Sequence, residues 1–236
     1  TTGEWLLFTD ADVHFFEDVL CRVVSVAQQQ DLDHLALVPL ITSDSFFAQC
    51  AISTSLRGIT VTQKVWRISE PDAKEAFGAG AFNLVRKSHF DTTPGFEWLK
   101  MEVADDIGLA QMLKAAGGKT HMVRTTKFVS VEWYPSVRSL VRGLEKNAYA
   151  QLANFSLLRG LSFSVLLVIV PMSPLFLLFV SGRTELVAVG AMALLGATWS
   201  SVLLRAVTNV CWYKTLASFV IGEMLLSWVV LRSTIL

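Results

Sequence analysis

The stretch "EWLLFTDADV", residues 4–13, joins four consecutive apolar residues to two carboxylates that stand one residue apart. The run Trp5–Phe8 is typical of a short, fully buried strand inside an α/β sheet. Polar residues that directly follow such a strand lie at its carboxyl end, where ligands bind in open α/β sheets. The stretch therefore predicts an α/β domain with Asp10 and Asp12 at a binding edge. A second Asp-x-Asp, Asp31-Leu32-Asp33, lies in a polar stretch and carries no such prediction.

Up to about residue 134, patterns typical of helices alternate with patterns typical of strands. We expect helices at Asp18–Gln29, Ser43–Arg57 and Glu102–Gly118, and strands at His34–Ile41, Ala81–Val85 and Thr120–Thr125. The last helix is marked by apolar residues at the i, i+3, i+4 and i+7 spacing and by two glycines at its end. This alternation predicts an α/β domain over residues 1–134.

Three apolar runs follow, each close to the length of about 20 residues that crosses a bilayer. They cover Gly160–Gly182, Leu186–Leu204 and Thr215–Leu231, and only Glu223 interrupts the third. Just before them, apolar and basic residues line different sides of a predicted helix, as in helices that lie at a membrane surface. We therefore divide the chain into an α/β domain at 1–134, an amphipathic interfacial helix at 135–158 and a three-span transmembrane region at 159–236.

Charged residues indicate the orientation of the chain and exclude one class of partner. Lys and Arg cluster before the first apolar run and between the second and third, which marks the cytoplasmic side of a membrane protein. We predict an integral membrane protein whose N-terminal part is cytoplasmic, in the inner or plasma membrane if the source is bacterial. A formal net charge of zero argues against a nucleic-acid partner, and three cysteines at unrelated spacings fit a reducing compartment. Protein partners are left open.

Two pairs of carboxylates are the candidate chemical groups. Asp10 and Asp12 can hold a divalent cation through oxygen ligands, and that cation would neutralise a departing diphosphate. Asp105 and Asp106 lie at the start of a predicted helix, where a carboxylate can act as general base for an attacking hydroxyl. Both pairs have an alternative interpretation as helix caps, because Asp is a favoured N-cap residue. The four histidines are scattered, which is more typical of structural or surface residues than of a metal site.

The order of several motifs carries a resemblance to a known family. The segments "FTDADV", "GAGAFNLVRKSHF" and "PGFEWLKMEVADDIGLAQML" are followed by a basic helix and apolar spans. This order resembles the membrane-bound family 2 glycosyltransferases of the GT-A type, and it is similar to ceramide glucosyltransferase and its hopanoid-associated bacterial relatives over residues 3–150. The resemblance implies the C-terminal half of a GT-A, Rossmann-like catalytic domain. It also implies a nucleotide-binding half upstream, so we expect this part of the protein to be inactive by itself.

Carried over by position, the resemblance implies roles for the two acidic pairs. Asp10 and Asp12 match the Asp-x-Asp of the family, with Asp12 favoured as the direct ligand of Mg²⁺ or Mn²⁺ and Asp10 nearer the nucleotide sugar. Asp106 matches the aspartate of the family's Glu-Asp motif, which is its catalytic base. Asp105 stands where Glu is usual, a conservative departure that leaves the base in place.

The resemblance also implies contacts with donor and acceptor. Gly78, Ala79 and Gly80 belong to a loop that lies by the donor sugar, and Gly95 and Phe96 lie near the acceptor. Trp98 is a further candidate for contact with the acceptor, with packing in the core as its alternative. Members of the family often carry Gln/Arg-x-x-Arg-Trp before the membrane, whereas this chain has "VRSLVRGLEKN" without a Trp. Arg138 and Arg142 therefore have two interpretations, contact with the donor's diphosphate or with anionic lipid headgroups.

Together these residues predict an inverting hexosyltransferase that uses a nucleotide-sugar, expected to be a UDP-sugar, with Mg²⁺ or Mn²⁺. The acceptor is expected to be a hydroxyl of a lipid or lipid-linked molecule at the cytoplasmic membrane face. Two alternatives stay open. One is a processive polysaccharide synthase of the same family, and the other is a non-catalytic membrane scaffold in which the acidic pairs only cap helices.

Overall fold

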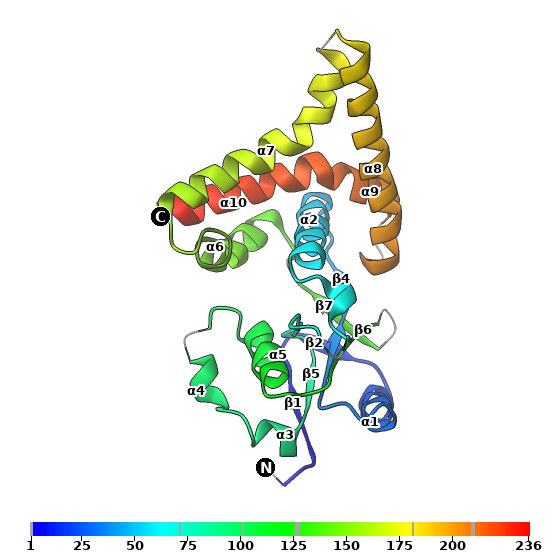
Figure 1. The fold of residues 1–236 in the computed structure, drawn as a ribbon, viewed down its shortest axis with the longest axis vertical. Coiled ribbons are helices and arrows are strands. Elements are labelled where there is room, and N and C mark those ends of the chain that lie inside the picture. Colours follow the sequence, from blue (N-terminus) through cyan, green and yellow to red (C-terminus); the bar gives the residue numbers. More distant parts are fainter. Residues whose placement is uncertain (1, 71, 101, 126–127, 181, 209–210) are drawn as a thin grey trace. The chain divides into compact units, whose positions relative to one another are not determined.

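The computed structural model describes residues 2–70, 72–100, 102–125, 128–180, 182–208 and 211–236. These residues form helices and mixed β-sheets, which confirms the predicted α/β class (Figure 1). The chain divides into two compact units, and each is described by itself. The first contains residues up to Thr42 together with Ile59–Glu132, and the second contains Ser43–Gly58 together with Trp133–Leu236.

The first unit is built on two small sheets and a set of mostly short helices. Its strands are β1 Trp5–Phe8, β2 Val13–Phe15, β3 His34–Val38, β4 Leu40–Thr42, β5 Asn83–Arg86, β6 Thr120–Arg124 and β7 Val129–Glu132. Its helices are α1 Val19–Gln29, the 3₁₀ helix η1 Val65–Arg67, α3 Lys87–Phe90, α4 Phe96–Leu99 and α5 Asp105–Ala115. The helices expected at Asp18–Gln29 and Glu102–Gly118 are confirmed as α1 and α5.

The larger sheet has the order β1-β5-β3-β6, and helices cover both of its faces (Figure 1). Strands β1 and β3 run antiparallel to β5, and β6 runs parallel to β3. Neighbouring residues of β5 face opposite sides, since Leu84 packs in the cluster beneath α1 and Val85 in the cluster beneath α5. This alternation of the strand buries apolar side chains on both faces of one sheet.

The smaller sheet, with the order β2-β7-β4, corrects several sequence predictions. The segment His34–Ile41, predicted as one strand, is divided between β3 in the larger sheet and β4 in the smaller one. Strands β2 and β7 were not predicted. The prediction that Trp5–Phe8 is fully buried is wrong, because all four residues are half-buried. Strand β1 lies at the edge of its sheet, with one neighbouring strand instead of two.

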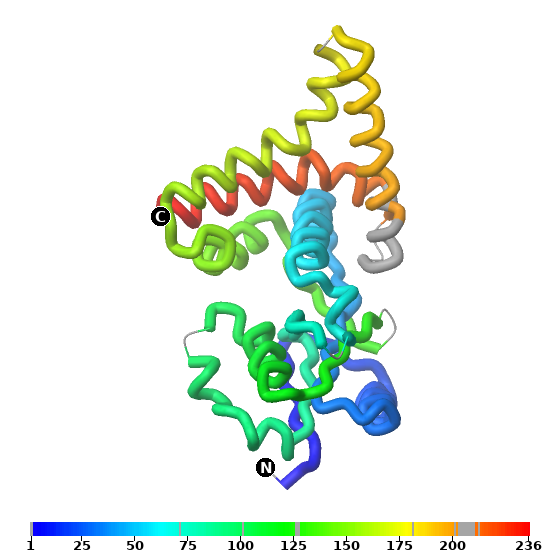
Figure 2. The backbone as a smooth tube through the Cα atoms, viewed as in Figure 1, coloured from blue at the N-terminus to red at the C-terminus, as the bar shows by residue number. Residues whose placement is uncertain are grey.

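The second unit is helical. It contains the Phe46–Gly58 part of α2 (Phe46–Thr62), then α6 Val137–Ala153, α7 Leu157–Phe179, α8 Thr184–Thr208, α9 Trp212–Ala217, the π-helix η2 Ser218–Gly222 and α10 Glu223–Ile235. Figure 2 shows α10 running alongside α7, and α6 also packs against α10. By length and composition, two helices are suited to crossing a membrane, Leu157–Phe179 and the continuous helix Tyr213–Ile235. These match the first and third predicted spans. The second predicted span, Leu186–Leu204, lies in α8, whose apolar part Thr184–Ser200 is shorter, and it stays a prediction.

Inside the second unit, Glu223 has a basic partner. The guanidinium of Arg57 on α2 donates to Oε1 of Glu223 at 2.6 Å, and both side chains are about 15% exposed. The same guanidinium donates to the hydroxyl of Ser218 at 3.1 Å and lies 3.9 Å from the ring centroid of Phe219. A carboxylate within an apolar helix is costly unless it is paired. Glu223 is therefore a structural ion-pair partner that joins α2 to the last helix.

Candidate functional site

The antiparallel pairing of β1 with β5 brings Asp10 to the glycine loop. Phe8 is opposite Asn83 in the register, so the carboxyl end of β1 lies beside the residues that enter β5. The backbone N–H of Asp10 donates to the carbonyl of Gly80 at 2.9 Å, and the hydroxyl of Thr9 donates to the carbonyl of Ala81 at 2.9 Å. Two segments some seventy residues apart in sequence thus form one edge.

The Asp-x-Asp lies in the exposed turn between β1 and β2. Both Asp10 and Asp12 are exposed there. The N-cap of the following helix, α1, is Asp18. The alternative interpretation of Asp10 and Asp12 as helix caps is therefore wrong, and their carboxylates stand at a solvent-accessible edge where a ligand can reach them.

The second acidic pair lies in the first turn of α5. Oδ2 of Asp106 accepts from the backbone N–H of Gly80 at 3.0 Å, and Oδ1 accepts from the N–H of Ile107 at 2.8 Å. Asp105 is exposed and accepts from the N–H of Asp106 at 3.1 Å. Carboxylates in this turn are favoured by the helix dipole. The N-cap of α5 is Ala104, so the interpretation of this pair as N-caps is wrong, although both carboxylates accept from N–H groups of the first turn. Only Asp106 also contacts the glycine loop.

Burial raises the pKa of Asp106 above the usual value for an Asp carboxyl. The N–H groups of Ile107 and Gly80 oppose this shift of the pKa, while the nearby charges of Asp105 and Asp10 add to it. A carboxylate with a raised pKa is a stronger base than one with the usual pKa. The environment of Asp106 therefore suits a general base.

One residue, Gly80, links the two pairs. The N–H of Gly80 donates to Oδ2 of Asp106, and its carbonyl accepts from the backbone N–H of Asp10. A Cβ on Gly80 would stand 2.5 Å from Oδ2 of Asp10, so any larger residue there would displace that carboxylate. A Cβ on Gly78 would overlap the carbonyl oxygen of Asp106. The loop predicted to lie by the donor therefore packs directly between Asp10, a candidate metal ligand, and Asp106, the candidate base. It consists of Gly78, Ala79 and Gly80.

The predicted acceptor residues adjoin the same edge of the first unit. Gly95 has a positive φ of 62° and precedes α4, which packs against α5. The ring of Phe96 lies 6.1 Å from that of Phe8, the last residue of β1, and 5.6 Å from that of Phe90. Trp98 is 47% exposed, so the alternative that it packs in the core is wrong. Exposed aromatic side chains are available near the acidic residues.

Arg138 and Arg142 lie on α6 in the second unit, and both side chains are exposed. The helix itself, predicted as amphipathic, is confirmed, with Leu140 fully buried on its apolar side. Ser136 caps the helix, because its hydroxyl accepts from the N–H of Ser139. Exposed guanidinium groups on one helix are suited to anionic groups of a ligand or of a lipid surface.

The acidic edge fits a metal that arrives with a phosphate ligand. In the part of the chain that the structure describes, no group of three or more His, Cys, Asp or Glu side chains is placed to hold a metal ion. Mg²⁺ and similar cations are commonly held by one or two carboxylates together with substrate phosphates. Two exposed carboxylates at Asp10 and Asp12 match that donor set.

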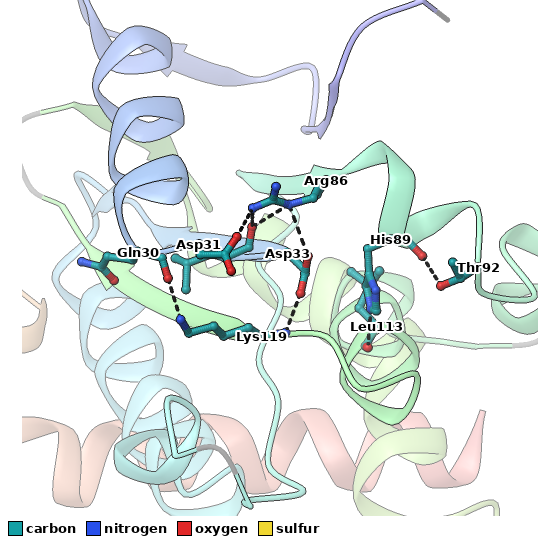
Figure 3. Close-up of polar contacts among 9 residues, drawn as sticks. Gln30, Asp31, Asp33, Arg86, His89, Thr92, Leu113 and Lys119 are labelled. Atoms are coloured by element: carbon teal, nitrogen blue, oxygen red, sulfur yellow. Dashed lines mark hydrogen bonds and ion pairs between the residues drawn. The ribbon is translucent and has the colours of Figure 1, made fainter.

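The second Asp-x-Asp has a structural role. Figure 3 shows the guanidinium of Arg86 between Asp31 and Asp33, at 3.0 and 3.3 Å. The same guanidinium donates to the carbonyl of Leu32, and Asp33 accepts from the backbone N–H of Lys119 at 3.0 Å. These contacts connect the start of β3 to β5 and to the segment before β6. The Asp-x-Asp pattern by itself does not distinguish this structural pair from the exposed pair at Asp10 and Asp12.

Two residues at the site were not assigned a role from the sequence, Asn83 and His34. The side chain of Asn83 forms hydrogen bonds with both backbone groups of Ala79, and His34 contacts the Asn83 carboxamide. The available signal was a polar residue, Asn83, in an otherwise apolar strand after "GAGAF". Such a residue must find hydrogen-bond partners when it is buried.

An exposed carboxylate pair at a strand end, whose backbone is joined through Gly80 to a half-buried carboxylate, is an arrangement suited to transfer of a group from a phosphate-activated donor. The chain belongs to glycosyltransferase family 21, because the family model described as "Glycosyl transferase family 21" matches residues 1–234. This membership confirms the resemblance to glycosyltransferases of the ceramide glucosyltransferase type, although the match names family 21 and not family 2. The protein is thus a glycosyltransferase. No curated protein matches the chain.

Proposed function

We propose that the protein is an inverting glycosyltransferase that moves a sugar from a nucleotide-sugar to a hydroxyl of a lipid or lipid-linked acceptor. The expected donor is a UDP-sugar, and the expected location is the cytoplasmic face of a membrane. The observation that carries the proposal is that Gly80 binds both residues. Its carbonyl accepts from the backbone N–H of Asp10, and its N–H donates to Oδ2 of Asp106. These contacts hold a candidate donor-binding group and a candidate base at one edge.

In the proposed reaction, Asp106 accepts the proton of the acceptor hydroxyl. The acceptor oxygen then forms a bond to the anomeric carbon, and the bond from that carbon to the nucleoside diphosphate breaks on the opposite face, so the configuration inverts. The Gly80 N–H keeps Oδ2 of Asp106 in place for the proton transfer. Asp12, with Asp10 beside it, would hold Mg²⁺ or Mn²⁺, which when bound supplies positive charge to the leaving diphosphate.

Two observations support a lipid as the acceptor. The second unit contains two helices of membrane-spanning length and composition. The first unit exposes Phe96 at 63% and Trp98 at 47%, close to the helix that carries Asp106. Aromatic side chains with exposed faces are suited to apolar or sugar-bearing ligands. Arg138 and Arg142 on α6 would bind the donor's diphosphate or anionic headgroups.

The test uses the complete open reading frame expressed in membranes. Labelled UDP-sugars and GDP-sugars are supplied in turn, with and without Mn²⁺, and label is counted in the lipid extract. We expect Mn²⁺-dependent label that falls about 10²-fold or more in Asp106→Asn, since general-base catalysis contributes on that order. Asp31→Asn is the matched control because it makes the same change in the other Asp-x-Asp, and it should behave as wild type.

Retained transfer in Asp106→Asn would contradict the assigned base. Label in the insoluble pellet in place of the lipid extract would instead indicate a polymer product, as expected of a processive synthase. Absence of label from any donor in wild type would count against the proposed donor class.

A further inference from the structure

The glycine loop is fastened to the core of the first unit by the Asn83 side chain. Nδ2 of Asn83 donates to the carbonyl of Ala79 at 2.9 Å, and Oδ1 accepts from the N–H of Ala79 at 3.3 Å. One carboxamide therefore satisfies both backbone groups of the residue next to Gly80. Asn83 is 1% exposed, so water does not compete for these hydrogen bonds.

His34 supports the orientation of the Asn83 carboxamide. Nε2 of His34 lies 3.0 Å from Oδ1 of Asn83. Because Oδ1 can only accept, Nε2 carries the proton in this arrangement, and Nδ1 is bare. A flipped carboxamide would direct its NH₂ group at the N–H of Ala79 and its oxygen at the carbonyl of Ala79, so the backbone of Ala79 opposes the flip. The imidazole adds a second donor to Oδ1 and stabilises the same orientation.

The imidazole remains neutral in this position. His34 is fully buried, on the same sheet face as Val85 and beneath α5, and burial lowers its pKa to about 4. Its Nδ1 has no hydrogen-bond partner among the residues that the structure describes. A buried acceptor without a partner is destabilising. Apolar residues of similar size would fill the space without this cost, so packing alone does not account for the pair.

We propose that His34 and Asn83 are positioning residues. They hold the peptide group between Ala79 and Gly80, and so keep Gly80 in place between Asp10 and Asp106. The inference rests on the proposed function, since it assigns a purpose to the loop in sugar transfer. The pair contacts no reacting atom itself. It acts through Ala79, whose two backbone groups it holds, and so sets the direction of the neighbouring N–H that reaches Asp106.

The proposal distinguishes two histidine variants. In His34→Gln, the side-chain amide lies the same number of bonds from Cα as Nε2 and can donate to Oδ1 of Asn83. In His34→Leu, no donor is present, so among the described residues Oδ1 of Asn83 keeps only the N–H of Ala79 and the carboxamide is held less firmly. Val23→Ala is the matched control, because Val23 lies on α1 and is buried against the other face of the sheet, so its truncation weakens the same unit without touching Gly78–Gly80.

The first measurement is hydrogen exchange of the full chain, followed by mass spectrometry of a peptide that covers residues 76–83. We expect exchange about tenfold faster in His34→Leu and in Asn83→Leu, and near the wild-type rate in His34→Gln and Val23→Ala. Equal exchange in His34→Leu and His34→Gln, or the same acceleration in Val23→Ala, would refute the positioning role.

The second measurement is label transfer in membranes with the nucleotide-sugar that serves wild type. We expect kcat to fall about tenfold to a hundredfold in His34→Leu, with the donor KM nearly unchanged and with recovery in His34→Gln. A loss confined to KM would overturn the proposal. If wild type transfers no label, the proposed function fails, whereas the exchange measurement still decides whether the pair holds the loop.

Discussion

Gly78→Ala tests whether the glycine loop must pack against the start of α5. A Cβ at Gly78 would stand 2.5 Å from the carbonyl carbon of Asp106, in addition to overlapping its carbonyl oxygen. Carbon atoms in contact are about 3.5 Å apart, so the loop and the first turn of α5 would separate by about 1 Å. Backbone forms both sides of this contact. A side-chain rotation therefore cannot relieve the overlap, and Asp106 must move relative to the loop.

A displacement of about 1 Å at a catalytic group costs on the order of 10²-fold in rate. We therefore expect kcat for lipid labelling to fall about 10²-fold in Gly78→Ala. Gly58→Ala is the matched control, because its Cβ meets open space among the described residues, and it should transfer at the wild-type rate. A folded Gly78→Ala protein with wild-type kcat would show that the close approach has no part in catalysis.

Three further predictions concern the neighbouring groups. Gly80→Ala directs its Cβ at the carboxylate of Asp10, which can rotate away, so we expect a raised Mn²⁺ requirement with a smaller fall in kcat, measured by metal titration of transfer. Because the pKa of His34 is about 4 when folded and 6.5 when unfolded, the unfolded state binds the extra proton between these values. The free energy of unfolding should therefore fall by about 2 to 3 kcal/mol from pH 7.5 to 4.5. Urea unfolding followed by tryptophan fluorescence should show that loss in wild type and not in His34→Gln, and an identical loss in both would exclude His34 as its source. Arg57→Leu leaves the Glu223 carboxylate without its ion-pair partner and should lower the free energy of unfolding by about 3 kcal/mol. The double variant Arg57→Leu with Glu223→Leu should recover most of that loss. No recovery in the double variant would contradict the pairing.

Sequence reasoning identified the acidic residues of the site but not how they are held. Asp10 and Asp106 stand out because each lies next to a clear apolar pattern, a strand before the first and a helix after the second. The contacts of Gly80 with both depend on the pairing of β1 with β5, which is a long-range feature that local patterns do not encode. His34 was grouped with the other histidines as a structural or surface residue, and its hydrogen bond to Asn83 follows only from the sheet register.

The fold was predictable where elements are long and periodic. Helices α1 and α5 appear close to their expected bounds, whereas β2 (VHF) and β7 (VSVE) were missed because polar residues separate their few apolar ones and leave no apolar run. The break after Val38 falls at Pro39, which cannot donate to a strand ladder, and it was missed because apolar residues flank the proline on both sides. Apolar runs show that a segment is buried, and they do not show against which sheet it packs.

The membership of α2 has a consequence for dividing the protein. The chain leaves the first unit after Thr42, contributes Ser43–Gly58 to the second, and returns at Ile59 before β5 is made. The two units are therefore interleaved along the sequence, and no single cut yields one without a piece of the other. A chain ended after Glu132 would keep Arg57 and Thr54 but lose Glu223 and Ser218, with which they bond. To study the acidic residues of the first unit apart from the membrane helices, the segment Ser43–Gly58 must therefore be replaced by a linker as well.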